Sequence, residues 1–287
     1  MTNRSLGWYA TINRRNVSHW DIDKPVQEAV VPWITHTVHV KLVDLMRRVG
    51  TVRTLKAGEP IFEPHHPVDQ LILVTKGITA REVGTIAKAI AIAPPQHFAC
   101  GNLNFYTAQP CIGHYYALVP SEILCVPHSL MRQLLLKDPE LAWLFAMQAE
   151  LCALSDRLGF ASLTSLSVEE RIIAFFIAWG KNYGRLVHDE KGEAFCLMPM
   201  TIQRKYLTHV VNSSRVSLDK TFTKWHEAGQ YYLENEQIRM SFDLMNPVYD
   251  WILHNEENAL FQRASTFAET VRNDSVVFAR HAEGFTN

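Results

Sequence analysis

A short segment of the chain gathers basic side chains in a sequence that is otherwise close to neutral. Residues 201–225 contain five basic residues and one acidic residue, a local balance of +4, whereas the whole chain has a formal net charge of −1. Clustered Lys and Arg side chains neutralise phosphates and supply most of the affinity of proteins for nucleic acids. The segment therefore predicts a local surface for phosphate contacts, and the net charge excludes binding by bulk charge alone.

The spacing within this segment predicts two short helices joined by a turn. The turn falls at Asn212, because Asn tolerates a left-handed backbone better than most residues. Ser213 or Ser214 can then cap the second helix. The apolar residues of that helix, at spacings of four and three, share one face; they are Leu218, Phe222 and Trp225.

A predicted hairpin follows the second helix, which ends at Gly229. Residues 231–244 read as two short strands around Glu234-Asn235-Glu236 and would form a β-wing. A solvated amphipathic helix beside a hairpin is the alternative, but two short helices at this spacing with a wing favour docking to double-stranded DNA. The candidate DNA-contacting residues are Arg204, Lys205, Ser213, Ser214, Arg215, Ser217, Lys220 and Lys224.

The preceding regions must position this segment. Residues 36–50 predict an amphipathic helix, and residues 51–127 predict short strands at roughly ten-residue spacing, typical of a small sandwich or barrel. Residues 138–166 carry apolar side chains at alternating steps of three and four, which favours a helix that pairs with its twin in a homodimer. The alternative is that this helix packs on its own domain. The predicted dimer interface is Leu144, Met147, Leu151, Leu154 and Leu158.

Two further features extend this outline. Ser167 and Glu170 have capping-box spacing and start a helix that Gly184 ends. Residues 246–287 predict a helical extension whose apolar side chains need burial, on the preceding domain or on a partner subunit. These side chains are Trp251, Leu253, Leu260 and Phe261.

This order of parts resembles the cyclic-AMP receptor/FNR superfamily of bacterial transcription regulators. The family's recognition-helix motif, roughly S-R-E-T-V-S-R-x-L-x-x-L-x-x-x-G, aligns without gaps on Ser214 to Gly229, with Val216 in place of the base-reading Glu. The resemblance covers about residues 36–245. It implies an α+β fold, with a near-palindromic DNA operator, a second copy of the chain, a small-molecule effector and RNA polymerase as partners.

The resemblance also divides the chain into five parts. These are an N-terminal extension (1–35), a β-roll effector-sensing domain of the double-stranded β-helix, cupin-like type (36–137), a dimerisation helix (138–166), a winged helix-turn-helix (167–245) and a C-terminal extension (246–287).

The effector of the sensing domain is not expected to be cyclic AMP. Asn102 stands where the family's ribose-binding Glu is found, and Cys111 where its phosphate-binding Arg is found, so a buried phosphate would lack a counter-charge. Three alternatives stay open: a small aromatic or phenolic ligand, as in the halophenol-sensing branch that residues 197–201 resemble; a thiol switch; and haem on His114. The candidate effector residues are Gly101, Asn102, Phe105, Cys111, His114 and Tyr116.

Several classes of protein are disfavoured by the sequence. The N-terminus lacks a secretory signal, and the longest apolar run, residues 172–179, is too short to span a bilayer. Five widely spaced cysteines, none of them before Cys100, favour free thiols in a reducing cytoplasm over an iron–sulfur cluster. The absence of catalytic motifs and of metal-ligand spacing predicts a non-enzyme without metal or cofactor. A sensor or scaffold of this fold that no longer binds DNA is the remaining alternative to a regulator.

Overall fold

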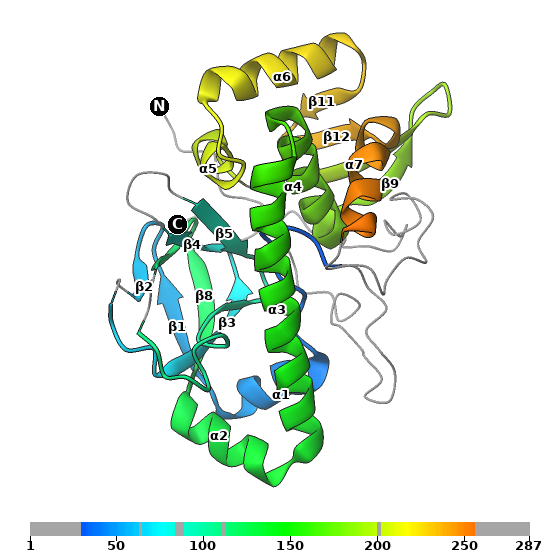
Figure 1. Ribbon diagram of the computed structural model, residues 1–287. Helices are drawn as coiled ribbons and strands as arrows, with labels where there is room; N and C mark the ends of the chain where they lie inside the picture. Colours follow the sequence, from blue (N-terminus) through cyan, green and yellow to red (C-terminus); the bar gives the residue numbers. More distant parts are fainter. Residues whose placement is uncertain (1–29, 63–64, 84–88, 111–112, 200–201, 256–287) are drawn as a thin grey trace, which may run out of the picture.

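The protein, in a computed structural model, consists of two domains joined by one long helix, α3 (Figure 1). The structure describes residues 30–62, 65–83, 89–110, 113–199 and 202–255. We call residues 40–137 the β-domain and residues 168–254 the helical domain. Helix α3, Pro139–Ser165, runs past both of them. The side chain of Asp138 starts this helix by accepting hydrogen bonds from the backbone N–H groups of Glu140 and Leu141, both at 3.1 Å.

The β-domain is built from two four-stranded antiparallel sheets with helices at one end. The sheets have the orders β1-β8-β3-β6 and β2-β7-β4-β5. The elements are α1 Val40–Val49, β1 Thr51–Leu55, β2 Pro60–Phe62, β3 Gln70–Lys76, β4 Thr79–Val83, β5 Ala89–Ala93, β6 Phe98–Cys100, β7 His114–Ala117, β8 Ser121–Pro127 and α2 His128–Lys137. The helix predicted over 36–50 and the strands predicted over 51–127 are thus present.

Alternation along the central strands divides the interior of the β-domain into two layers. In β3, Leu71 and Leu73 face a core shared with α1, α2 and the start of α3, whereas Ile72 and Val74 face the core between the two sheets. Successive side chains of a strand point to opposite faces, so this run of apolar residues serves both layers. The central strand β3 is consequently buried on both faces.

The segment preceding α1 is part of the core. The hydroxyl of Ser155 in α3 donates hydrogen bonds to the carbonyl oxygens of Val31 at 2.6 Å and Ile34 at 3.1 Å. The side-chain amide of Gln148 donates to the carbonyl of His36 at 2.9 Å. Residues 30–35, the end of the predicted N-terminal extension, thus pack between α3 and strand β5. Residues 1–29 lie outside the described residues.

The helical domain combines four helices with a four-stranded sheet of order β11-β12-β10-β9. Its elements are α4 Val168–Tyr183, β9 Arg185–His188, β10 Ala194–Pro199, α5 Arg204–Val210, α6 Arg215–Glu227, β11 Tyr231–Glu234, β12 Gln237–Ser241 and α7 Phe242–His254. The predicted capping box of Ser167 and Glu170 is confirmed at the start of α4. Strands β9 and β10 were not predicted; they pair with each other and with the hairpin β11-β12.

Helix α7 begins at Phe242, so the predicted boundary at residue 246 falls inside it. It packs against α4, and its Leu253 is buried there while Trp251 is partly buried. Of the two places considered for this burial, the chain's own domain is the one observed. Leu260 and Phe261 lie outside the described residues.

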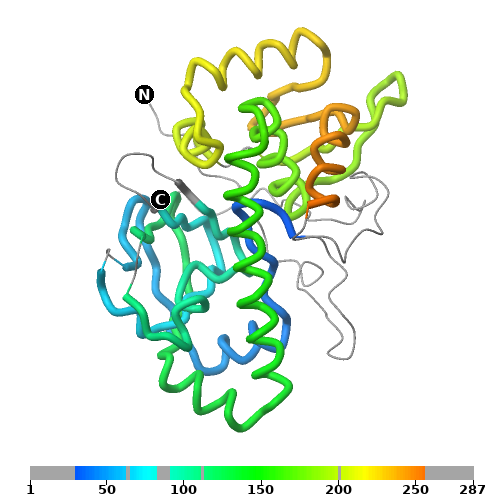
Figure 2. Tube along the Cα trace, in the orientation of Figure 1, coloured from blue at the N-terminus to red at the C-terminus, as the bar shows by residue number. Residues whose placement is uncertain are grey.

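The two domains also touch directly. Helix α5 lies against β5, the strand at the edge of the second sheet (Figure 2). Ile92 of β5 and Tyr116 of β7 belong to the same apolar cluster as the interior of the helical domain. One continuous apolar core thus connects the second sheet of the β-domain with the buried side chains of α5 and α6.

Candidate nucleic-acid interface and candidate effector pocket

The helix pair α5–α6 folds as the local sequence signals predict. Asn212 adopts a left-handed backbone with φ of +48°, and the hydroxyl of Ser214 accepts a hydrogen bond from the N–H of Ser217 at 3.0 Å. Helix α6 buries its predicted apolar face, Leu218, Phe222 and Trp225. The turn and the cap are therefore confirmed, and together they fix the angle at which α6 leaves α5.

The opposite face of α6 is open to solvent. It presents Val216, Lys220, Thr223 and Glu227, which recur at the helical spacing and are all exposed. Lys220 was predicted as a DNA contact, while Thr223 was missed although it follows Lys220 by three residues. Helical periodicity, counted outward from the buried face, would have found it.

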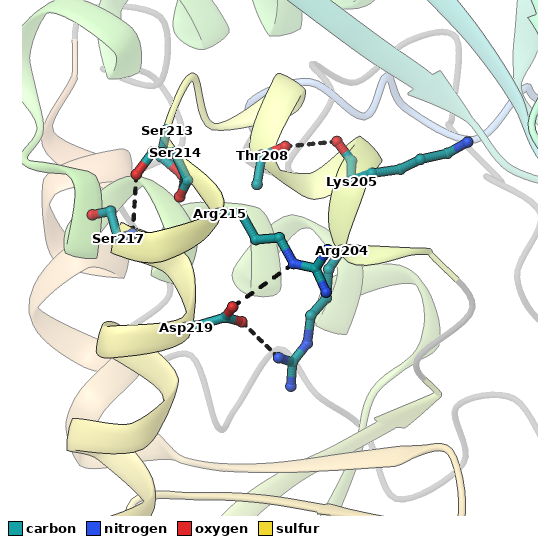
Figure 3. A network of polar contacts seen from close by, with 8 residues as sticks. All are labelled: Arg204, Lys205, Thr208, Ser213, Ser214, Arg215, Ser217 and Asp219. Atoms are coloured by element: carbon teal, nitrogen blue, oxygen red, sulfur yellow. Dashed lines mark hydrogen bonds and ion pairs between the residues drawn. The ribbon is translucent and has the colours of Figure 1, made fainter.

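Several of the predicted cations are paired within the chain (Figure 3). Asp219 accepts a hydrogen bond from Nη1 of Arg204 at 2.6 Å, and its other oxygen lies 3.8 Å from Nε of Arg215. Lys224 pairs with Glu169 of α4 at 2.8 Å. Such exposed pairs contribute about 0–1 kcal/mol each, so a phosphate can compete for these cations. Lys205 is exposed, with its Nζ 4.6 Å from the centre of the Tyr206 ring.

The predicted serines occupy different environments. Ser214 is exposed but its hydroxyl already caps α6, and Ser217 is half-buried. The hydroxyl of Ser213 donates a long hydrogen bond of 3.4 Å to the carbonyl of Ser214. A polar contact with DNA from Ser213 or Ser217 would thus cost little, whereas one from Ser214 competes with the cap.

The hairpin after α6 has the predicted turn. Asn235 and Glu236 both have positive φ, +50° and +61°, as a two-residue hairpin turn requires. Arg239 of β12 stacks over the ring of Tyr232 at 4.3 Å and over that of Phe195 in β10 at 5.0 Å. The stacking links the hairpin to β10, the next strand of the same sheet.

A small cavity lies between the second sheet of the β-domain and α3. It has a volume of about 40 Å³, room for only a few water molecules. Its walls come from β4, β5, β6, β7, residues 101–104, Thr35 and two residues of α3, Cys152 and Asp156. Alanines at 91, 93 and 99 leave this space open.

Two of the predicted effector residues line the cavity. They are Gly101 and Asn102. Gly101 has φ of +89°, and a Cβ built on it would lie 2.2 Å from the carbonyl oxygen of Gln70, so only glycine fits this turn. Cys111 lies outside the described residues.

The other three predicted effector residues lie elsewhere. Phe105 is buried in an aromatic cluster, with ring centroids 4.6 Å from Phe145 of α3 and 5.0 Å from His128 of α2. His114 lies against the ring of Tyr116, whose hydroxyl donates to Glu82 at 3.3 Å. None of the three lines the cavity: Phe105 belongs to a core, and Tyr116 points to the opposite face of β7 from Tyr115, which does line it.

The polar centre of the cavity was not predicted. Arg81 of β4 donates from Nη2 to Oδ1 of Asp156 in α3 at 2.7 Å. Burial alone would lower the pKa of Arg81, but the charges and hydrogen bonds of Asp156 and Tyr115 raise it, so the guanidinium stays protonated. The alternation in β4 placed Arg81 beside Thr79, but no local signal indicated the partner 75 residues away.

The cysteines described by the structure give no support to the thiol switch. Cys100, Cys125, Cys152 and Cys196 are all buried. Burial raises the pKa of Cys152 to about 12 and raises those of Cys125 and Cys196. Thiolate, the reactive form, is therefore scarce at Cys125, Cys152 and Cys196.

The predicted dimer seam of α3 is divided between two faces. Leu144, Leu151 and Leu158 are already buried within the chain, on the face of α3 that packs against the rest of the protein. Met147 and Leu154 are half-buried at the edge of the solvent-exposed side of α3. On that side Trp143 and Phe160 are 55% and 62% exposed. We call these four residues the exposed stripe of α3. The three leucines pack on residues 30–34 and on the helices of the β-domain, which the heptad pattern alone cannot reveal.

Two sequence-based expectations concern metals and membranes. The described residues bring together no group of three His, Cys, Asp or Glu side chains that could hold a metal ion. No helix in the described ranges combines the length and apolarity needed to cross a membrane.

Comparison with known proteins identifies the fold. No protein-family model and no curated protein matches the chain. Among solved structures, a CooA mutant from Carboxydothermus hydrogenoformans matches with a TM-score of 0.60 at 11% identity, over 76% of this chain and 97% of that one. TTHA1359 from Thermus thermophilus, a transcriptional regulator of the CRP/FNR family, matches with a TM-score of 0.51 at 17% identity, over 70% and 98%. The chain has the CRP/FNR fold.

The resemblance inferred from the sequence is thereby confirmed at the level of the fold. The CRP/FNR fold joins a β-barrel domain of the cyclic-nucleotide-binding type to a helical domain, in the order seen here. The halophenol-sensing branch is represented by CprK in complex with OCPA, with a TM-score of 0.56 at 14% identity, over 75% of this chain and 97% of that one.

Proposed function

We propose that the protein is a homodimeric, sequence-specific DNA-binding regulator of transcription. The observation that carries the proposal is the exposed face of α6, capped and angled by the turn at Asn212 and bordered by Arg215 and Lys220. In this proposal α5, α6 and the hairpin β11-β12 act as a winged helix-turn-helix, and α6 enters the major groove. Likeness to transcription regulators of the same fold supports it.

The base contacts would come from the N-terminal half of α6. Arg215 can bind guanine or phosphate, and Lys220 can reach a phosphate or a base edge. Val216, exposed between them, can contact a thymine methyl group but offers no acceptor to cytosine. We therefore expect an operator half-site that differs from one read by a glutamate at this position.

The proposed dimer forms along the exposed stripe of α3. Trp143, Met147, Leu154 and Phe160 would meet the same residues of a second copy. Two recognition helices related by a two-fold axis would then read half-sites about one DNA turn apart. The β-domain would act as a β-roll sensor whose effector, which is not a cyclic nucleotide, changes the position of α3.

The test is selection of binders from a random duplex-DNA pool, with and without chlorinated or hydroxylated phenols. The expected result is a two-fold symmetric motif. Arg215→Ala and Lys220→Ala should then each weaken binding by about 1–3 kcal/mol, or about 5- to 150-fold, where base edges are contacted, and less for phosphate alone. Lys137→Ala is the matched control, because this exposed lysine ends α2, at the far end of α3 from α6. Folded, dimeric protein that selects no motif, or unchanged affinity in both variants, would refute the proposal.

A further inference from the structure

The ion pair in the cavity fastens α3 to the β-domain. Arg81 sits in the middle of β4, paired in register with Ala91 of β5 and Tyr115 of β7. Its guanidinium reaches Asp156 on α3 at 2.7 Å, and the two side chains are only 22% and 19% exposed. Strand β4 is paired with β5 on one side and β7 on the other, so the sheet holds Arg81 in place. Asp156 belongs to α3, the element that can shift.

Asp156 leaves part of the guanidinium unused. The hydrogen bond to Asp156 comes from Nη2, while Nε of Arg81 is buried and has no hydrogen-bond partner in the part of the chain that the structure describes. A guanidinium presents its donors as a planar fork that matches the two oxygens of a carboxylate. Tyr115 is a second partner of the guanidinium, but the buried Nε–H remains a donor that neither Asp156 nor Tyr115 satisfies.

Because the cavity is small, a ligand can bind there only by displacing part of the cavity wall. A space of about 40 Å³ accepts a few water molecules, so a larger molecule must push aside part of the wall. An anion that entered beside Asp156 would place two negative charges against one cation, which favours exchange over addition. The other described ionisable groups that line the cavity around Arg81 are Tyr115 and the thiols of Cys100 and Cys152.

The geometry points to a binding site for a small organic carboxylate, which Arg81 holds in place of Asp156. This inference rests on the proposed function, to which it adds the chemical class of the effector and the contact that transmits binding. Release of Asp156 removes the ion pair that holds α3 to β4, in the same stretch of helix as Leu154 of the proposed dimer stripe. Loss of that contact lets α3, and the helical domain that follows it, change position relative to the β-domain.

The test uses unfolding and requires no DNA. Asp156→Asn keeps the shape of the side chain and frees the charge of Arg81, and sodium acetate serves as the probe. The midpoint of thermal unfolding is measured against acetate concentration, with acetamide as the uncharged analogue and sodium chloride at equal ionic strength. We expect a saturable rise in Asp156→Asn with half-saturation at an acetate concentration at least about tenfold lower than in the wild type, and no response to acetamide.

The double variant Arg81→Met/Asp156→Asn tests whether acetate binds to Arg81, and it should lose the acetate response. A response in Asp156→Asn no larger than that to chloride, or one that survives in the double variant, would overturn the inference. If Asp156→Asn does not fold, the wild type and Arg81→Met are compared at high acetate, where only the wild type should respond. An acetate response without any selected DNA motif would reject the proposed function alone, and a DNA motif without an acetate response would reject this inference alone.

Discussion

Glu169 of α4 connects helix α6 to the rest of the helical domain, and its replacement gives a prediction with a defined magnitude. Its Oε1 accepts a hydrogen bond from the indole N–H of Trp225 at 2.7 Å, and its Oε2 lies 2.8 Å from Nζ of Lys224. Trp225 is fully buried, whereas the Lys224 side chain is 66% exposed. The two partners therefore differ in what they lose when Glu169 is replaced.

The magnitudes follow from that difference. The pair with exposed Lys224 is screened by solvent and contributes at most about 1 kcal/mol. A buried indole N–H left without an acceptor costs about 1–3 kcal/mol. Glu169→Ala should thus lower the free energy of unfolding by about 1–4 kcal/mol, while Glu169→Gln, which retains an acceptor oxygen, should lower it by at most about 1 kcal/mol.

Urea unfolding at pH 7, followed by tryptophan fluorescence, measures both variants. Lys224→Ala is the matched control and should cost no more than about 1 kcal/mol. A Glu169→Gln variant as unstable as Glu169→Ala, or a Lys224→Ala variant that loses more than about 2 kcal/mol, would refute the reasoning that the buried indole dominates.

The pH dependence provides an independent check. Burial alone would raise the pKa of Glu169, but the hydrogen bonds from Lys224 and Trp225 outweigh it and hold the pKa below the usual 4.5. A carboxyl whose pKa is lowered in the folded state contributes stability above its unfolded pKa and loses it as the pH falls. The difference between the wild type and Glu169→Gln should therefore shrink below about pH 4.5.

Two further predictions concern acid stability and assembly. Burial lowers the pKa of His97 from 6.5 to about 4, so the neutral form is favoured in the folded state and stability is lost as the pH falls below 6.5. Between pH 7 and pH 5 the wild type should lose about 2 kcal/mol more than His97→Gln in urea titrations, and equal losses would contradict a buried neutral imidazole. Phe160→Glu should weaken the dimer about 10- to 100-fold in sedimentation equilibrium by removing about 1.5–3 kcal/mol of apolar burial. Leu136→Glu, at an 86% exposed position on α2, should leave the dimer unchanged, and a dimer unaffected by Phe160→Glu would exclude this face of α3.

Local sequence determined the elements of the candidate DNA interface. The turn at Asn212, the cap at Ser214 and the end of α6 at Gly229 each depend on backbone preferences of one residue and its nearest neighbours. The same holds for the capping box of α4. Signals of this range survive in any tertiary setting, which is why these predictions were correct.

Only the tertiary structure decided which faces and partners these elements use. Leu144, Leu151 and Leu158 follow the heptad pattern of a dimer helix, yet they pack within their own chain, two of them beside residues 30–34, more than 100 positions earlier. Arg81 and Asp156 meet across 75 residues because a sheet and a helix enclose the same cavity. A periodic pattern indicates that one face of an element is buried, but it does not identify the element that covers this face. Burial depends on apolar area, whereas the covering element depends on the path of the whole chain.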